Sequence, residues 1–134
     1  MSRKVARENV YKLVFEFLFS ETPNNRTYSV LTSGDVDESD VKYMEKVYYG
    51  IMDNYKDLIK LISDHSEGFA VDRIYKPDLS ALLVAIYEMK YIDDIPVAVS
   101  INEAVELVKK YSTDKSNSFV NGILASINKS LQEQ

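Results

Sequence analysis

The stretch Ser39–Ile62, SDVKYMEKVYYGIMDNYKDLIKLI, carries the clearest periodic pattern in the chain. Its apolar positions are separated by alternating steps of three and four residues: Val41, Met44, Tyr48, Ile51, Tyr55, Leu58 and Ile62. This is the spacing of one face of an α-helix, so the stretch predicts helical structure with one buried face. Because a glycine inside a helix costs about 1 kcal/mol relative to alanine, the pattern fits either one long helix or two shorter helices broken between Gly50 and Asn54.

The same spacing predicts helices on both sides of this stretch. Residues 3–19 form the first, with an apolar face of Ala6, Val10, Leu13, Val14, Phe17 and Leu18. Pro77 suits the first turn of another helix, whose inner and outer faces are marked by Leu79, Leu82, Leu83, Ile86 and Lys90. A third helix follows Pro96, and a last one runs from about Ser116 toward a polar end.

Two segments are less determined by their sequence. The helix after Pro96 begins either with a capping box of Ser100 and Glu103 or with Pro96 inside its first turn. Residues 20–37 are rich in turn-forming side chains and lack sustained periodicity, which predicts a long loop. The sequence thus indicates an all-α chain in which residues 1–134 form one domain.

Composition excludes several classes of protein. The chain has 134 residues, 46% of them hydrophobic and 28% charged, which is an ordinary globular balance. With no cysteine, disulfides, thiol nucleophiles and zinc sites with sulfur ligands are excluded. No apolar stretch approaches the roughly 18 to 20 residues that span a membrane, and the first ten residues are charged rather than signal-like. We therefore expect a cytoplasmic protein without membrane contact.

The charge is unevenly distributed along the chain. The net charge is −5, which argues against nonspecific coating of nucleic acid. Residues 1–12 nevertheless carry +3, residues 13–100 carry −8 and residues 101–134 are neutral. The basic N-terminal end can therefore meet a polyanion locally.

Residue patterns typical of catalysis are missing. The four glycines are scattered, so no phosphate-binding loop is predicted. His65 is the only histidine, and the acidic pairs lie in turn-like sequence where carboxylates usually cap helices or face solvent. We expect no catalytic residues, no metal and no cofactor.

The C-terminal third of the chain resembles a known family. The stretch Pro96–Tyr111, PVAVSINEAVELVKKY, is followed by Ser116–Leu124, SNSFVNGIL, and together they resemble the NusB family of transcription antitermination factors. The basic opening Arg3–Glu8 and the tetrapeptide Ala85–Glu88 also resemble that family. The resemblance implies a compact all-α domain of about six to seven helices in two packed bundles. Residues 20–37 match weakly, so we expect the family's second helix to be absent there.

The resemblance implies a non-catalytic, RNA-binding function. Members pair with NusE, a small-subunit ribosomal protein, bind boxA-type single-stranded RNA in nascent ribosomal transcripts, and join the RNA polymerase antitermination complex. The family's two RNA-contacting regions fall on Arg3, Lys4 and Arg7, and on Lys115, Ser118 and Phe119. Arg3 and Arg7 are four residues apart, so both are expected to reach one RNA backbone from one helix face. Phe119 can stack on a base or pack in the core.

The family's partner surface falls on Phe15 and Asp78. Phe15 can equally belong to the core, and Asp78 in a first helical turn is stabilised by the helix dipole without any partner. The resemblance leaves open a homodimer. The alternative function is a helical protein–protein interaction module that does not touch RNA. Related helical domains are fused to RNA methyltransferases, but this chain has no room for such a domain.

Overall fold

The computed structural model describes residues 1–133, which form seven α-helices, one short 3-10 helix and no strand. The elements are α1 (Arg3–Ser20), α2 (Asn25–Leu31), α3 (Glu38–Asp53), α4 (Tyr55–His65), η1 (Val71–Arg73), α5 (Lys76–Tyr91), α6 (Val97–Tyr111) and α7 (Ser116–Gln132). The predicted all-α class is confirmed. Within these residues, no helix is long and apolar enough to cross a membrane.

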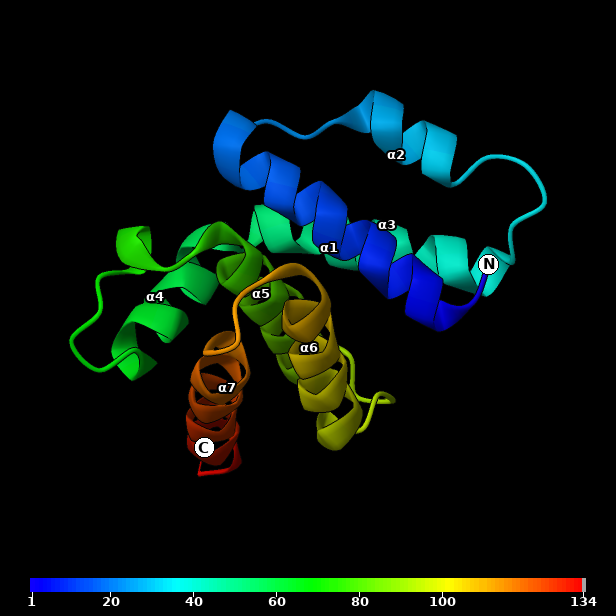
Figure 1. Ribbon diagram of the computed structural model, residues 1–134. Coiled ribbons are helices and arrows are strands. Elements are labelled where there is room, and N and C mark those ends of the chain that lie inside the picture. The colour runs from blue at the N-terminus through cyan, green and yellow to red at the C-terminus, as the bar shows by residue number, and fades with distance from the viewer. Residues whose placement is uncertain (134) are drawn as a thin grey trace.

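The helices form two groups that share α5 (Figure 1). Helices α1, α2 and α3 lie together on one side, and α4, α6 and α7 lie on the other. Helix α5 runs between them and contacts α1 and α3 in the first group and α4, α6 and α7 in the second. The core is continuous through both groups. This arrangement places the start of α1 beside α6, and the start of α5 beside the turn between α6 and α7.

Helix α5 is buried on all sides. Every residue from Asp78 to Glu88 is buried, and exposure returns only near the end, at Lys90. The prediction of separate inner and outer faces for this helix is therefore wrong over most of its length. A helix that is apolar all round belongs at the centre of a fold, where neighbours cover every face.

The stretch Ser39–Ile62 forms parts of two helices, α3 and α4, rather than one long helix. Asn54 ends α3, because its backbone N–H and its side-chain amide both donate to the carbonyl of Gly50, at 3.0 and 2.8 Å. Gly50 itself lies inside α3 and faces Tyr87 of α5 so closely that an added Cβ would clash with the phenol ring. The glycine thus serves close packing of two helices, and the asparagine makes the break.

The predicted loop over residues 20–37 contains a helix, α2, so this prediction is wrong. Asn24 caps α2 by accepting a hydrogen bond from the backbone N–H of Thr27 at 2.9 Å. The ring of Tyr28 packs on the rings of Tyr48 and Tyr49 in α3, with centroids 6.1 and 5.1 Å away. A seven-residue helix is too short to show a periodic pattern, and the tertiary contact through Tyr28 is what stabilises it.

The start of α6 differs from both alternatives. Pro96 immediately precedes the first helical residue, Val97, and its carbonyl accepts from the N–H groups of Val99 and Ser100. Ser100 is inside the helix and buried, and its hydroxyl donates to Glu88 of α5 at 2.8 Å. A capping box of Ser100 and Glu103 is therefore excluded, because the serine hydroxyl is engaged with another helix.

Candidate nucleic-acid interface

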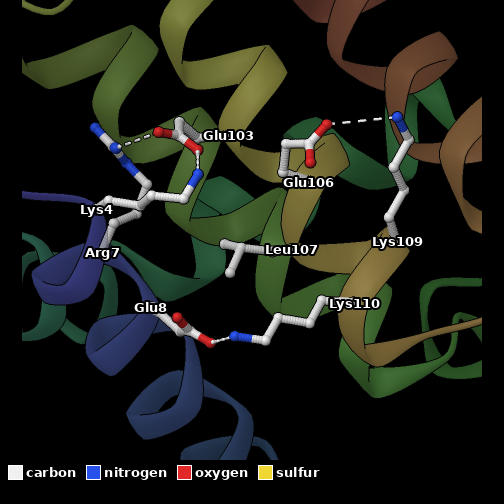
Figure 2. A pocket seen from close by; sticks show the side chains of 8 residues that line it. All are labelled: Lys4, Arg7, Glu8, Glu103, Glu106, Leu107, Lys109 and Lys110. Atoms are coloured by element: carbon white, nitrogen blue, oxygen red, sulfur yellow. Dashed lines mark hydrogen bonds and ion pairs between the residues drawn. The ribbon is translucent and has the colours of Figure 1, made fainter.

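The N-terminal half of α1 and the facing side of α6 enclose a shallow hollow of about 260 Å³ (Figure 2). Its lining is mostly charged: Lys4, Arg7, Glu8, Glu103, Glu106, Leu107, Lys109 and Lys110. Figure 2 shows Lys4 and Arg7 both directed at Glu103, while Glu8 meets Lys110. Lys4, Arg7 and Lys110 are therefore matched by acids from the other wall, and Lys109 pairs with Glu106 of its own helix.

Arg7 is buried, with 5% of its surface exposed. Its Nε donates to Glu88 at 2.8 Å and its Nη2 donates to the other oxygen of Glu88 at 3.3 Å. Tyr43 and Ser100 also donate to the same carboxylate. Burial by itself lowers the pKa of Arg7, but the hydrogen bond to Glu88 and the nearby negative charges outweigh it, so the pKa is raised. The prediction that Arg3 and Arg7 reach one RNA backbone from one helix face is therefore wrong, because Arg7 is buried and only Arg3 lies at the surface.

Arg3 and Lys4 remain at the surface. The Arg3 side chain is 41% exposed; its Nε donates to Asp40 at 3.0 Å and its guanidinium lies over the Tyr43 ring. The Lys4 side chain is 69% exposed and pairs with Glu103 at 3.2 Å. The Lys4 pair lies at the surface, and surface pairs are worth about 0 to 1 kcal/mol, so a phosphate can replace Glu103 at little cost. Asp40 is buried, so Arg3 stays paired with it and offers a phosphate the exposed part of its guanidinium.

A second basic group lies further along the same two helices. Lys110 pairs with Glu8 at 2.8 Å, and the hydroxyl of Tyr111 donates to the same carboxylate. The hydrogen bond from Lys110, followed by that from Tyr111, lowers the pKa of Glu8. Lys12 lies over the ring of Tyr111 and forms no ion pair among residues 1–133. Sequence reasoning did not select Lys110 or Tyr111, because nothing local marks them as neighbours of α1.

The other predicted RNA-contacting residues lie at the start of α7. Lys115 and Ser118 are exposed, while Phe119 is half-buried against the core and meets the ring of Phe69 edge-on at 5.8 Å. No side chain caps the start of α7, and the N–H of Ser116 donates to the carbonyl of Thr113 at 3.0 Å. The structure thus gathers Lys115, Ser118 and Phe119 at one helix end, but it does not bring them into the hollow of Figure 2.

The predicted partner residues have different surroundings. Phe15 is half-buried and lines a small hollow of about 260 Å³ with Tyr11, Lys12, Pro77 and Tyr111. Asp78 is buried, and its carboxylate accepts hydrogen bonds from Ser112 at 2.7 Å and Ser116 at 3.0 Å. Asp78 therefore ties the start of α5 to the turn between α6 and α7. Within residues 1–133, no group of three or more metal-binding side chains is placed to hold an ion.

The comparisons with known proteins agree with one another. The profile of the NusB family matches residues 2–129. The transcription antitermination protein NusB of Listeria monocytogenes serotype 4a is 36% identical over 127 residues, which cover 95% of this chain and 96% of the relative. The protein of the same name from Acetivibrio thermocellus is 39% identical over 128 residues, 95% of this chain and 88% of the relative.

Solved structures share the fold. NusB of T. maritima superposes with a TM-score of 0.89 at 31% identity, covering 96% of this chain and 92% of that one. A structure of the antitermination factors NusB and NusE in complex with dsRNA superposes with a TM-score of 0.83 at 24% identity, covering 96% of both chains.

Proposed function

Because the chain belongs to the NusB family of transcription antitermination proteins, we propose that it binds boxA-type single-stranded RNA together with NusE in the cytoplasm and joins the RNA polymerase antitermination complex. The family is non-enzymatic, and the chain acts in antitermination without catalysing a reaction. The observation that carries the proposal is that two separate surface sites carry accessible cations. Arg3 and Lys4 lie at the start of α1, and Lys115 lies beside the ring of Phe119 at the start of α7.

The RNA contacts fall on the accessible members of the predicted set. Arg3, Lys4 and Lys115 supply positive charge to phosphates, Ser118 adds a hydroxyl at the start of α7, and Phe119 offers a ring edge. Arg7 holds α1 against α5 through Glu88 and so positions Arg3 and Lys4. It contributes to RNA binding as a positioning residue.

The NusE contact falls on the hollow beside Phe15. The hydroxyl of Tyr11, which lines this hollow, has no hydrogen-bond partner among the described residues. This hydroxyl is closed off from solvent, so the rings around the hollow are what a ligand meets. The rings of Phe15, Tyr11 and Tyr111 favour a protein ligand that presents an apolar side chain. Asp78 supports this surface by holding the adjacent turn.

Titration of the chain with boxA and scrambled RNA, with and without NusE, at several salt concentrations tests the proposal. If Arg3, Lys4 and Lys115 each neutralise one phosphate, log affinity falls against log salt with a slope of about −2. The double substitution Arg3→Gln, Lys4→Gln should reduce that slope by about 1.4. The matched control is Lys46→Gln, Lys56→Gln, which removes two exposed charges elsewhere. Equal affinity for boxA and scrambled RNA, or equal effects of the two double substitutions, would contradict direct RNA recognition.

The alternative function is a helical protein–protein interaction module that does not bind RNA directly. Two features favour it: all three basic residues at the start of α1 are paired with internal carboxylates, and an apolar hollow lies beside Phe15. Both functions predict that Phe15→Ala weakens NusE binding, but only this alternative predicts that the Arg3, Lys4 double substitution leaves RNA binding by the complex unchanged. Measuring both variants against the NusE complex separates the two functions.

A further inference from the structure

The segment between α4 and α5 brings side chains against the start of α7 that sequence reasoning did not select. Phe69, Arg73 and Tyr75 come from this segment, and Lys115 and Phe119 come from the α7 end. Together they line a hollow of about 260 Å³, which we call the aromatic hollow. Pockets for drug-sized ligands begin at about 300 Å³, so this volume suits a single planar ring system rather than a whole cofactor.

The aromatic hollow exposes two large rings to solvent. Phe69 is 57% exposed and Tyr75 is 62% exposed, although both side chains are large enough to stabilise the core if buried. Phe69 stands edge-on to Phe119, with ring centroids 5.8 Å apart and an interplanar angle of 71°. One face of Phe69 is thus left without an aromatic partner in the described part of the chain, and it is available to another flat ring.

Local backbone structure holds Phe69 in place. Glu67 and Gly68 have positive φ angles of 31° and 84°, which turn the chain sharply after α4. The buried hydroxyl of Ser66 lies 2.8 Å from the carbonyl of Phe69, and the N–H of Phe69 donates to the carbonyl of Ser66 at 3.0 Å. The ring is therefore presented in a preset position, which lowers the entropic cost of binding.

The rim of the aromatic hollow carries free positive charge. Arg73 and Lys115 are exposed, and neither forms an ion pair in residues 1–133. The nearest acids along the chain, Asp72 and Asp114, are exposed and do not pair with them. The one carboxylate that lines the hollow, Asp78, is satisfied by two serine hydroxyls. Both rim cations are therefore available to flanking phosphates.

We propose that the aromatic hollow is a stacking site for one base of a single-stranded RNA, with Phe69 and Tyr75 contacting the base and Arg73 and Lys115 the phosphates on either side. This inference rests on the proposed RNA-binding function and adds three contacts to it. Aromatic rings interleaved with unpaired cations are typical of single-stranded nucleic-acid sites, where rings stack on bases and cations follow the backbone. A protein ligand would need acidic side chains at the spacing of the two cations, whereas every nucleotide of a single strand carries both a phosphate and a flat base.

Three substitutions at Phe69 and Arg73 separate stacking from simple apolar contact. Phe69→Leu keeps a large apolar side chain against Phe119 but removes the flat face, so boxA RNA should bind the NusE complex about 5- to 100-fold more weakly. Phe69→Trp restores a flat face and should bind within about twofold of the original chain. Arg73→Gln should reduce the salt slope by about 0.7, whereas the control Lys46→Gln should leave it unchanged.

A direct readout uses boxA RNA in which a single base at a time is replaced by the fluorescent base 2-aminopurine. Stacking predicts that one position is strongly quenched on binding and that Phe69→Leu restores its fluorescence. Circular dichroism should show unchanged helix content in the variant, since Phe69 is exposed.

The outcomes are distinguishable. If Phe69→Leu binds RNA like the original chain while Arg3→Gln, Lys4→Gln binds weakly, the aromatic hollow is not a base site and the proposed function stands. If Phe69→Leu weakens NusE binding and leaves RNA affinity unchanged, the hollow is a protein contact and the inference fails. If the original complex does not prefer boxA over scrambled RNA, the proposed function fails together with the inference.

Discussion

Glu88 is the centre of a buried hydrogen-bonded cluster. It is fully buried, and it accepts hydrogen bonds from Arg7, Tyr43 and Ser100, which come from three different helices. A buried carboxylate is tolerated only when it is paired and hydrogen-bonded. This cluster therefore joins α1, α3 and α6 to the central helix, and it explains why Arg7 does not reach the surface.

Removing one partner of this buried pair should be strongly destabilising. Glu88→Leu removes the buried carboxylate that accepts two hydrogen bonds from Arg7 and leaves the guanidinium only its longer pair with Glu103, at 3.5 Å. We expect a loss of about 3 to 5 kcal/mol in the free energy of unfolding. The double substitution Arg7→Met, Glu88→Leu should lose much less, because it leaves no unpaired charge. Urea denaturation measures all three chains, with Lys4→Met as the control on α1. A loss below about 1 kcal/mol for Glu88→Leu would contradict the role of the pair.

Tyr43 should make stability fall at alkaline pH. Burial, and then the charge of Glu88, raise the pKa of Tyr43 in the folded chain. The unfolded chain releases this proton near pH 10 while the folded chain keeps it, so the stabilisation is complete below pH 10 and is lost as pH rises above it. Tyr43→Phe should cost about 1 to 3 kcal/mol at pH 7 and flatten the decline between pH 10 and 12. Unfolding curves at successive pH values check this, and equal declines in both chains would contradict it.

At the scale of elements, close packing between α3 and α5 depends on Gly50. The phenol of Tyr87 occupies the space that a side chain at this position would need, and Tyr87 is itself buried. Periodicity along α3 identifies the helix but contains no information about α5. From the sequence alone, Gly50 looks like a residue that destabilises the helix. In the structure it lets Tyr87 of α5 pack against the backbone of α3.

Gly50→Ala should destabilise the chain although alanine is the better helix former. The gain in helix propensity is about 1 kcal/mol, whereas overpacking a buried contact costs about 1 to 3 kcal/mol. We expect a lower melting temperature for Gly50→Ala, with at least partial recovery in Gly50→Ala, Tyr87→Leu. The control Gly122→Ala lies on an exposed face of α7 with nothing within 4 Å of the added carbon, and it should be neutral or stabilising. A melting temperature for Gly50→Ala at or above that of the original chain would refute this account.

At the scale of the whole molecule, acids from distant elements offset the basic N-terminal end. Arg3 pairs with Asp40 of α3, and Lys4 pairs with Glu103 of α6. The +3 of residues 1–12 is thus largely matched by the acidic body of the fold. RNA must compete with these carboxylates, so binding is expected to be local and dependent on the partner rather than driven by bulk charge.

Removing a competing carboxylate should strengthen RNA binding. Glu103→Gln frees Lys4, and since exposed pairs are worth about 0 to 1 kcal/mol, we expect affinity for boxA RNA to rise up to about fivefold. Arg7 keeps its pair with Glu88, so the fold should survive. The control is Glu106→Gln, which frees Lys109 instead. Equal gains from both substitutions, measured by RNA titration at one salt concentration, would show that the effect is general charge and not competition at Lys4.

The sequence by itself determined most of the helices and the family. Helix formation follows the spacing of apolar residues along the chain, which is local, so α1, α5, α6 and α7 were predicted close to their observed bounds. The region of α3 and α4 was predicted as helical, and the choice between one helix and two stayed open. The short helix α2 was missed because its stability comes from Tyr28 packing on α3. The capping box at Ser100 was wrong because the hydroxyl serves Glu88 instead.

Tertiary structure alone decided which basic residues are available. Arg3, Lys4 and Arg7 look equivalent in the sequence, but their partners lie 37, 99 and 81 residues away along the chain. The partners of Arg3 and Lys4 leave them at the surface, while that of Arg7 lies in the core. Likewise, Phe69 and Arg73 join Lys115 and Phe119 only through the packing of distant segments. Burial and ion pairing are set by such long-range contacts, and no local pattern encodes them.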